Sequence, residues 1–149
     1  MPALKEAAAA NRWSRSLAIG ARGVSLVIAE MYEHQIVPCV PLLDIGYDLI
    51  AAHNNVLNRV QVKSTAVKTE TTNGLCSFSV RRHKSCRFRR QKPGKTSQYS
   101  ENEIDVFIFV HTELRQFFIV PGAEILYCRH KISFLPDSVW RDAWHILKA

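Results

Sequence analysis

The segment IDVFIFV, residues 104–110, is the most apolar stretch of the sequence and constrains the fold more than any other segment. A second apolar run, residues 116–120, follows after the polar turn TELR. Short apolar runs bounded by turn residues are typical of strands in the centre of a sheet. The sequence therefore predicts a β-sheet with these two runs as central strands.

Helical patterns flank this predicted sheet at both ends of the chain. Apolar residues recur at helical spacing over residues 16–34, which predicts a helix packed on the sheet. Near the end, Pro136 and Asp137 precede apolar residues at helical spacing, which predicts a closing helix. Residues 36–43 contain two prolines and predict an edge strand or an extended approach to the next element.

The length of 149 residues suits one well-buried core, so we expect a single domain over residues 1–149. Residues 1–15 have high helical propensity and are expected to form a leading helix or arm. No run reaches the roughly 18 apolar residues that a membrane helix needs. Glu6 and Arg12 stand where a signal peptide would be apolar. We therefore expect a soluble, cytoplasmic protein.

The cysteines and the net charge narrow the function further. Four cysteines without a CxxC pair favour reduced thiols, and the spacing of Cys76, His83 and Cys86 matches no usual zinc pattern. The net charge of +7 favours a polyanionic partner, because phosphate neutralisation releases counterions.

The positive charge is concentrated in one segment that contains no acidic residue between Glu70 and Glu101. Residues 75–80 and 86–88 predict the two strands of a basic β-hairpin that spans residues 75–95. A solvated charged loop is the alternative interpretation, but so many like charges repel one another unless they face phosphate. Such a hairpin could lie in the major groove of DNA. The candidate nucleic-acid-binding residues are Arg81, Arg82, Lys84, Arg87, Arg89, Arg90, Lys92 and Lys95.

A second predicted hairpin, residues 48–52 and 56–63, brings three polar side chains together. If its turn is centred on Asn54 and Asn55, paired positions sum to about 109, and Asp48 lies opposite Gln61. Lys63 is then one diagonal step away on the same face. A register slip of one residue would move Asp48 to the other face. A simple exposed ion pair between Asp48 and Lys63 is the structural alternative.

These residue types suit hydrolysis of phosphodiesters. Asp48 can hold a hard cation such as Mg²⁺, and the Gln61 amide oxygen and the Val62 carbonyl can add ligands. Lys63 can orient or help deprotonate the attacking water and can stabilise phosphoryl charge.

The two motifs together resemble the PD-(D/E)xK nuclease superfamily, and more closely its branch with Gln in place of the second acid. That branch, PD-(D/Q)xK, includes homing endonucleases of cyanobacterial group I introns and related bacterial proteins. The specific pair is YDLI at residues 47–50 and RVQVK at residues 59–63. The likeness covers about residues 20–147, and its other matching pieces are Gly20, Val40, Pro41, Asp44, Tyr99, Ser100, Ile104, Asp105 and residues 119–121.

The resemblance implies an α/β fold with a restriction-endonuclease-like core, a mixed β-sheet flanked by helices. It implies cleavage of double-stranded DNA that depends on a divalent metal, Mg²⁺ or else Mn²⁺, with catalytic roles for Asp48, Gln61 and Lys63. We also expect a homo-oligomer, a dimer or tetramer, because one such site cuts one strand.

One position departs from the family pattern, because Val24 stands where such proteins usually carry a glutamate on the first helix. Asp44 is the favoured substitute as a metal ligand, since Glu30 lies nearly two helical turns further on. Two other functions therefore remain open. One is a catalytically weak or inactive DNA-binding protein on the same fold, and the other is a structure-selective resolvase or repair nuclease.

Overall fold

The computed structural model of the chain describes residues 15–43, 45–67, 74–83, 96–97, 99–100, 102–125, 128 and 130–149. The predicted arm lies outside these residues except for Arg15, which begins the first described helix. No helix in these ranges is long and apolar enough to cross a membrane.

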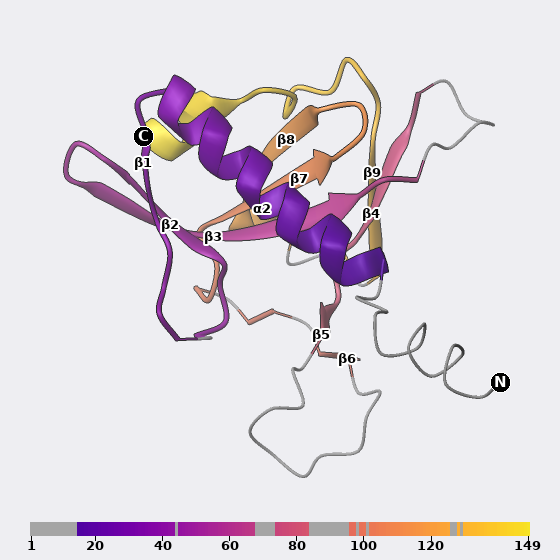
Figure 1. Cartoon of the computed structure of the whole chain (residues 1–149), viewed down its shortest axis with the longest axis horizontal. Helices are drawn as coiled ribbons and strands as arrows, with labels where there is room; N and C mark the ends of the chain where they lie inside the picture. Colours follow the sequence, from indigo (N-terminus) through magenta and orange to yellow (C-terminus); the bar gives the residue numbers. More distant parts are fainter. Residues whose placement is uncertain are drawn as a thin grey trace, which may run out of the picture.

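A five-stranded mixed sheet forms the centre of the molecule (Figure 1). Its strands lie in the order β1-β2-β3-β7-β8, and only the β3–β7 pair is parallel. The prediction of a mixed α/β fold is therefore confirmed. The strands are β1 (Val37–Cys39), β2 (Leu49–His53), β3 (Val56–Thr65), β7 (Val106–His111) and β8 (Gln116–Pro121).

The two apolar runs form β7 and β8, as predicted. Every residue of β7 is buried, because layers of structure cover both faces of the sheet at this strand. β8 is also largely buried, but it is the last strand of the sheet rather than a central one. Residues 140–142 cover its outer edge, since Ile119 N donates to Trp140 O at 2.9 Å and Asp142 N to Phe117 O at 3.0 Å. β1 lies at the opposite edge, which confirms the prediction from its prolines.

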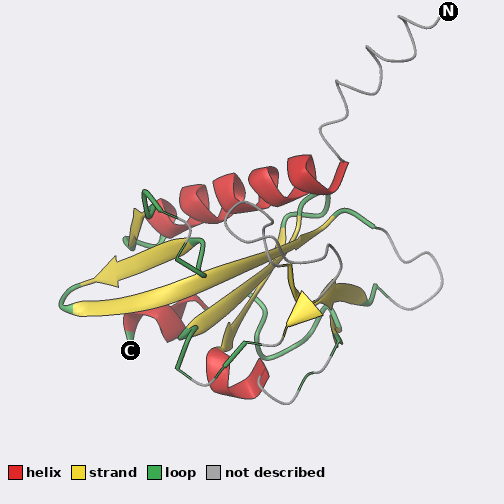
Figure 2. Ribbon diagram, turned by 90° about the horizontal axis from the view of Figure 1, so that it is seen from below, coloured by secondary structure: helices red, strands yellow, loops and turns green. Residues whose placement is uncertain are grey.

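Helix α2 (Arg15–Glu33) packs along one side of the sheet, as Figure 2 shows, and confirms the first predicted helix. Val27 and Met31 are buried against Val60 and Val62 of β3 in one core cluster. Gly23 allows the close approach of helix and sheet, because a Cβ atom there would stand 1.8 Å from Ser64 Oγ.

A second layer covers the other face of the sheet. It consists of the antiparallel pair β4 (Cys76–Ser79) and β9 (Lys131–Phe134) and the short helix α3 (Gly122–Ile125). Its core is aromatic: the rings of Phe118 and Phe134 stack with centroids 4.6 Å apart, and Phe78 lies 5.3 Å from Phe109. The sheet therefore separates two hydrophobic cores.

The C-terminal segment differs from the prediction of a closing α-helix. The only regular helix described after residue 135 is the 3₁₀ helix η1 (Trp144–Lys148). The preceding backbone pairs with the edge of β8, and Asp142 adopts a positive φ of 51°, which no α-helix allows. Trp140 and Trp144 therefore do not share one helical face. Trp140 packs in the aromatic core and Trp144 in the core under α2.

The predicted basic hairpin also differs in its first strand. Residues 76–79 form a strand, but its partner is β9, so its hydrogen bonds are not made with a following hairpin strand. A short antiparallel pair instead joins β5 (Arg82–His83) to β6 (Thr96–Ser97). The predicted strand at residues 86–88 lies outside the described residues, as do all the basic residues from Lys84 to Lys95.

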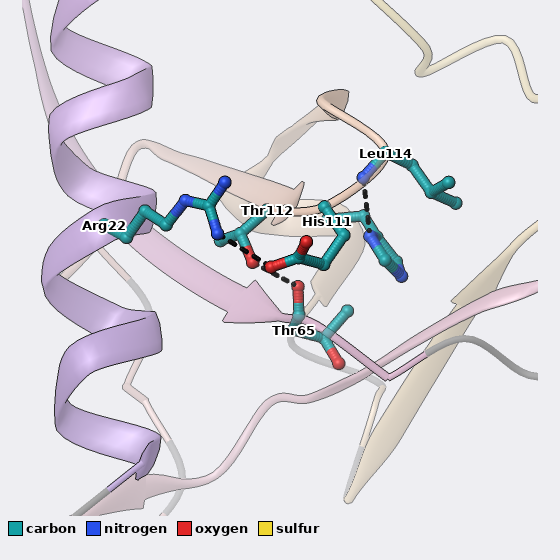
Figure 3. Close-up of polar contacts among 6 residues, drawn as sticks. Arg22, Thr65, His111, Thr112 and Leu114 are labelled. Atoms are coloured by element: carbon teal, nitrogen blue, oxygen red, sulfur yellow. Dashed lines mark hydrogen bonds and ion pairs between the residues drawn. The ribbon is translucent and has the colours of Figure 1, made fainter.

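Polar contacts join α2 and the C-terminal ends of β3 and β7 (Figure 3). Arg22 Nη1 donates to Glu113 Oε1 at 2.7 Å, and Thr112 Oγ1 donates to Thr65 O at 3.3 Å. The buried His111 accepts a hydrogen bond from Leu114 N at its Nδ1 atom, at 3.2 Å. These contacts satisfy polar groups where the strands end.

Candidate functional site

The hairpin that carries the candidate residues has the predicted register. The β2–β3 ladder runs from Leu49↔Val60 to His53↔Val56, and every pair sums to 109. Asn54 supplies the positive φ, 52°, that the tight turn requires. The ladder ends at Leu49↔Val60, one residue before Asp48 and Gln61.

Asp48 lies just before β2 and bonds β3 through both its backbone and its side chain. Its N–H donates to Val60 O at 2.9 Å. Its Oδ2 atom accepts the N–H of Val62 at 2.8 Å and a hydrogen bond from Gln61 Nε2. The carboxylate is therefore held against β3 by one main-chain and one side-chain donor, half-buried and beside the amide of Gln61.

Gln61 and Lys63 point to the face of the sheet away from α2. Val60 and Val62 belong to the core under α2, so the alternate residues of β3 face the other way. Their Cα partners across the parallel pair are Phe107 and Phe109, which belong to the aromatic core.

The Lys63 ammonium is held by groups from two loops. Nζ donates to the main-chain carbonyl of Arg81 at 3.0 Å and lies 5.1 Å from the centre of the Tyr99 ring. The sequence pattern did not indicate either contact, because both partners lie outside the hairpin and are placed by the tertiary fold. Tyr99 was part of the family resemblance, which carried no role for it.

Arg59, the arginine of RVQVK on β3, forms an ion pair with Asp105, which directly precedes β7. Arg59 donates to Asp105 from Nε at 2.9 Å, from Nη2 at 2.7 Å and from its main-chain N at 2.7 Å. The side-chain hydrogen bond from Arg59 lowers the pKa of Asp105, which burial alone would raise. In turn, the hydrogen bond to Asp105 raises the pKa of Arg59. Asp105 thus orients a basic neighbour.

The oxygen atoms around Gln61 form a donor set that a hard cation could use. Gln61 Nε2 lies 3.4 Å from Val62 O and also bonds Asp48. The amide oxygen and nitrogen exchange places when the amide turns over, which would bring the Gln61 oxygen between those of Asp48 and Val62. A carboxylate, an amide and a carbonyl oxygen are the chemistry that Mg²⁺ and Ca²⁺ prefer.

Among the residues that the structure describes, no three His, Cys, Asp or Glu side chains gather to hold a metal ion. Asp44, the favoured additional ligand, lies outside these residues. Val24 packs against the core under α2, on the opposite side of the sheet from Gln61 and Lys63. The described donor set therefore contains one carboxylate, that of Asp48.

The predicted nucleic-acid-binding residues are only partly described. Arg81 is half-buried, and its guanidinium contacts His130 Nδ1 from Nε at 3.0 Å and from Nη2 at 2.8 Å. The backbone of Arg82 lies in β5. Arg81, the first residue of the basic segment, thus lies next to Lys63, because its carbonyl accepts a hydrogen bond from the Lys63 ammonium.

Comparisons with known proteins identify the family and the fold of the chain. A family model described as PD-(D/E)XK endonuclease matches residues 16–135. Among solved structures, the bacterial homing endonuclease I-Ssp6803I matches with a TM-score of 0.69 at 23% identity, covering 91% of this chain and 95% of that chain. At this identity the match shows a shared fold. No curated protein matches the chain.

Proposed function

We propose that this chain, which belongs to the PD-(D/E)XK endonuclease family, hydrolyses phosphodiester bonds of double-stranded DNA with the help of a divalent metal ion. The observation that carries the proposal is the hydrogen-bonded junction of Asp48, Gln61 and Val62, with Lys63 on the same strand. This set offers oxygen ligands and a cation within one short hairpin.

Mg²⁺ is the proposed metal, and Mn²⁺ its substitute, because the donors are oxygen atoms. Asp48, the Gln61 amide oxygen and the Val62 carbonyl would hold it. When bound, the ion supplies Lewis-acid polarisation of the phosphate and neutralises its charge. Asp44 is a further proposed ligand.

Lys63 is the proposed electrostatic partner of the phosphate. Its ammonium would stabilise the charge that develops on the phosphoryl oxygens and orient the attacking water. Gln61 and Lys63 occupy alternate positions of β3, so both act from the same face of the sheet.

The likeness to a bacterial homing endonuclease supports DNA as the substrate and a homing-type cut as the biological activity. One site of this kind cuts one strand. We therefore propose a symmetric homo-oligomer, a dimer or tetramer, that presents two sites to the duplex.

Plasmid cleavage tests the proposal. Supercoiled plasmid is incubated with the protein and Mg²⁺ or Mn²⁺, and the wild type is compared with Asp48→Ala and Lys63→Ala. We expect each variant to lose about 100-fold or more in rate, the scale seen when one electrostatic group leaves a site. The matched controls Asp137→Ala and Lys148→Ala remove exposed charges outside the site and should cleave like the wild type.

Metal binding gives an independent readout. Mg²⁺ should raise the thermal midpoint of the wild type, because a ligand that binds only the folded state stabilises it. The Asp48→Ala variant should show no such rise. Equal rises in both proteins would remove Asp48 from the metal site.

A catalytically weak or inactive DNA-binding protein is the second candidate. The observation in its favour is the donor set that the structure describes, which contains the single carboxylate of Asp48, while position 24 of the first helix carries a valine instead of the glutamate usual in the family. Wild-type protein that binds DNA without cutting it, in either metal, would favour this candidate.

A further inference from the structure

We propose that Tyr99 is a positioning residue for Lys63, holding its ammonium over the face of an aromatic ring during the proposed cleavage reaction. The expected effect of Tyr99 on the cleavage rate rests on the proposed function. The contact itself rests only on the geometry: Nζ of Lys63 lies 5.1 Å from the centre of the Tyr99 ring.

The ring is held in place by the core of the protein. Tyr99 meets Phe107 edge to face, with centroids 5.1 Å apart and planes at 81°. Phe107 is only 1% exposed and stacks on Phe109 within the aromatic core. Because the buried Phe107 sets the angle of the Tyr99 ring, the face of the Tyr99 ring has a fixed orientation towards Lys63.

Lysine needs such support more than most side chains. Its ammonium is a point charge on a flexible four-carbon stem, and it loses its orientation easily. The face of an aromatic ring attracts a cation, and the Arg81 carbonyl adds a hydrogen bond at 3.0 Å from a second direction. Together the two contacts direct the ammonium along the face of the sheet that also carries Gln61.

Two substitutions separate the ring from its hydroxyl. Tyr99→Phe keeps the aromatic face, so its kcat should stay within about twofold of the wild type. Tyr99→Leu keeps apolar volume but loses the face, so its kcat should fall about 3- to 30-fold, while KM for the plasmid changes little. The matched control Phe134→Leu removes a ring from the same core and should leave kcat unchanged.

A double substitution tests whether the effect passes through the lysine. If Tyr99 acts only by positioning Lys63, the rate of Lys63→Ala/Tyr99→Leu should equal that of Lys63→Ala. An additional loss of the same size as in Tyr99→Leu alone would overturn the proposal. So would a loss of kcat in Phe134→Leu equal to that in Tyr99→Leu.

A measurement without DNA keeps the test independent of the proposed activity. The rate at which an acylating reagent modifies Lys63 is followed by peptide mass spectrometry. The rate should be equal in the wild type and in Tyr99→Phe and several-fold faster in Tyr99→Leu, because the attraction between the ring face and the ammonium holds the amine away from the reagent. Equal rates in all three proteins would overturn the positioning role, even if the wild type cleaves no DNA.

A fluorinated ring guards against loss of folding in Tyr99→Leu. A phenylalanine whose ring carries five fluorine atoms, introduced at position 99, keeps the shape of the side chain but loses the electron-rich face. Labelling of Lys63 should then be faster than in Tyr99→Phe. Labelling at the Tyr99→Phe rate would show that the ring acts through its shape alone, and the proposal would fail.

Discussion

Asp105 and Arg59 form the best-defined ion pair beside the site, and their bond makes stability depend on pH. The folded carboxyl has a lowered pKa, chiefly through the side-chain hydrogen bond from Arg59. A lowered folded pKa stabilises the protein above the ordinary pKa of aspartate, near 3.9, and this stabilisation is lost as pH falls through the folded value. The pair therefore weakens in acid.

Asp105→Asn should remove this dependence. We expect the variant to be less stable than the wild type by about 1 kcal/mol at pH 7, a modest value because about a third of the pair is exposed. The difference should begin to shrink as pH falls below about 3.9, the ordinary pKa of aspartate. Urea unfolding at several pH values measures it, with the exposed Asp137→Asn as control. A gap that stays constant from pH 7 to pH 3 would contradict the role of the charge.

Gln61→Glu should make folding stability more sensitive to metal than it is in the wild type. A second carboxylate beside Asp48 adds like-charge repulsion, so the thermal midpoint in EDTA should fall below that of the wild type. Mg²⁺ would relieve the repulsion, and the rise in midpoint on adding it should exceed that of the wild type. Thermal midpoints of both proteins, measured in EDTA and in Mg²⁺, test this expectation. A fall in EDTA that Mg²⁺ does not reverse would argue against a metal at this position.

At the scale of single residues, the sequence predicted the positions that are set by the pairing of β2 with β3. The two-residue asparagine turn set the register of the ladder up to Leu49 and Val60, and the side chains of Asp48 and Gln61 meet one residue beyond it. The contacts of Lys63 could not be predicted in the same way. Arg81 and Tyr99 reach it from loops whose paths depend on the whole fold.

The packing of α2 on β3 gives a matched pair of glycine substitutions on one helix. At Gly23 a Cβ atom would meet Ser64 Oγ at 1.8 Å and Val110 Cγ1 at 2.9 Å, whereas at Gly20 it would meet nothing within 4 Å. Gly20→Ala should stabilise the protein by about 0.5 to 1 kcal/mol, because alanine favours helices. Gly23→Ala should destabilise it by about 1 kcal/mol or more, because overpacking outweighs that gain.

Urea unfolding of both glycine variants measures the difference directly. An equal rise in the free energy of unfolding would mean that the helix can move away from β3 at no cost.

Elements with strong local patterns were predictable, and those decided by distant partners were not. The first five residues of β7 are all apolar and α2 has clear helical spacing, so both elements were expected. The segment before η1 has helical spacing too, but its backbone bonds the edge of β8 instead. In the same way, β4 was expected to pair with the segment after it, and its partner is β9, far along the chain. Non-local pairing leaves no local signal.

For the molecule as a whole, the net charge of +7 has a measurable consequence for DNA binding. Replacing Arg87, Arg89 and Arg90 by alanine should weaken binding and flatten its salt dependence. Each lost phosphate contact lowers the slope of log K against log salt by about 0.9, so the slope should fall by up to about 3. Fluorescence anisotropy with a labelled duplex at several salt concentrations measures it.

A control with the same change in net charge separates position from total charge. Alanine at Arg15, Arg115 and Lys148 also removes three charges, from residues that lie outside the basic segment. A slope that falls equally in both triple variants would mean that overall charge, rather than the basic segment, controls affinity.

The bond between Lys63 and residue 81 has a practical meaning for redesign. The acceptor is a peptide oxygen, which every amino acid carries, so the identity of the residue at this place is free to change while the amine stays tethered. A protein engineer could thus replace the Arg81 side chain to test its proposed contact with DNA while the carbonyl that holds Lys63 stays in place. Deleting residue 81 would remove both the arginine side chain and the carbonyl that holds Lys63.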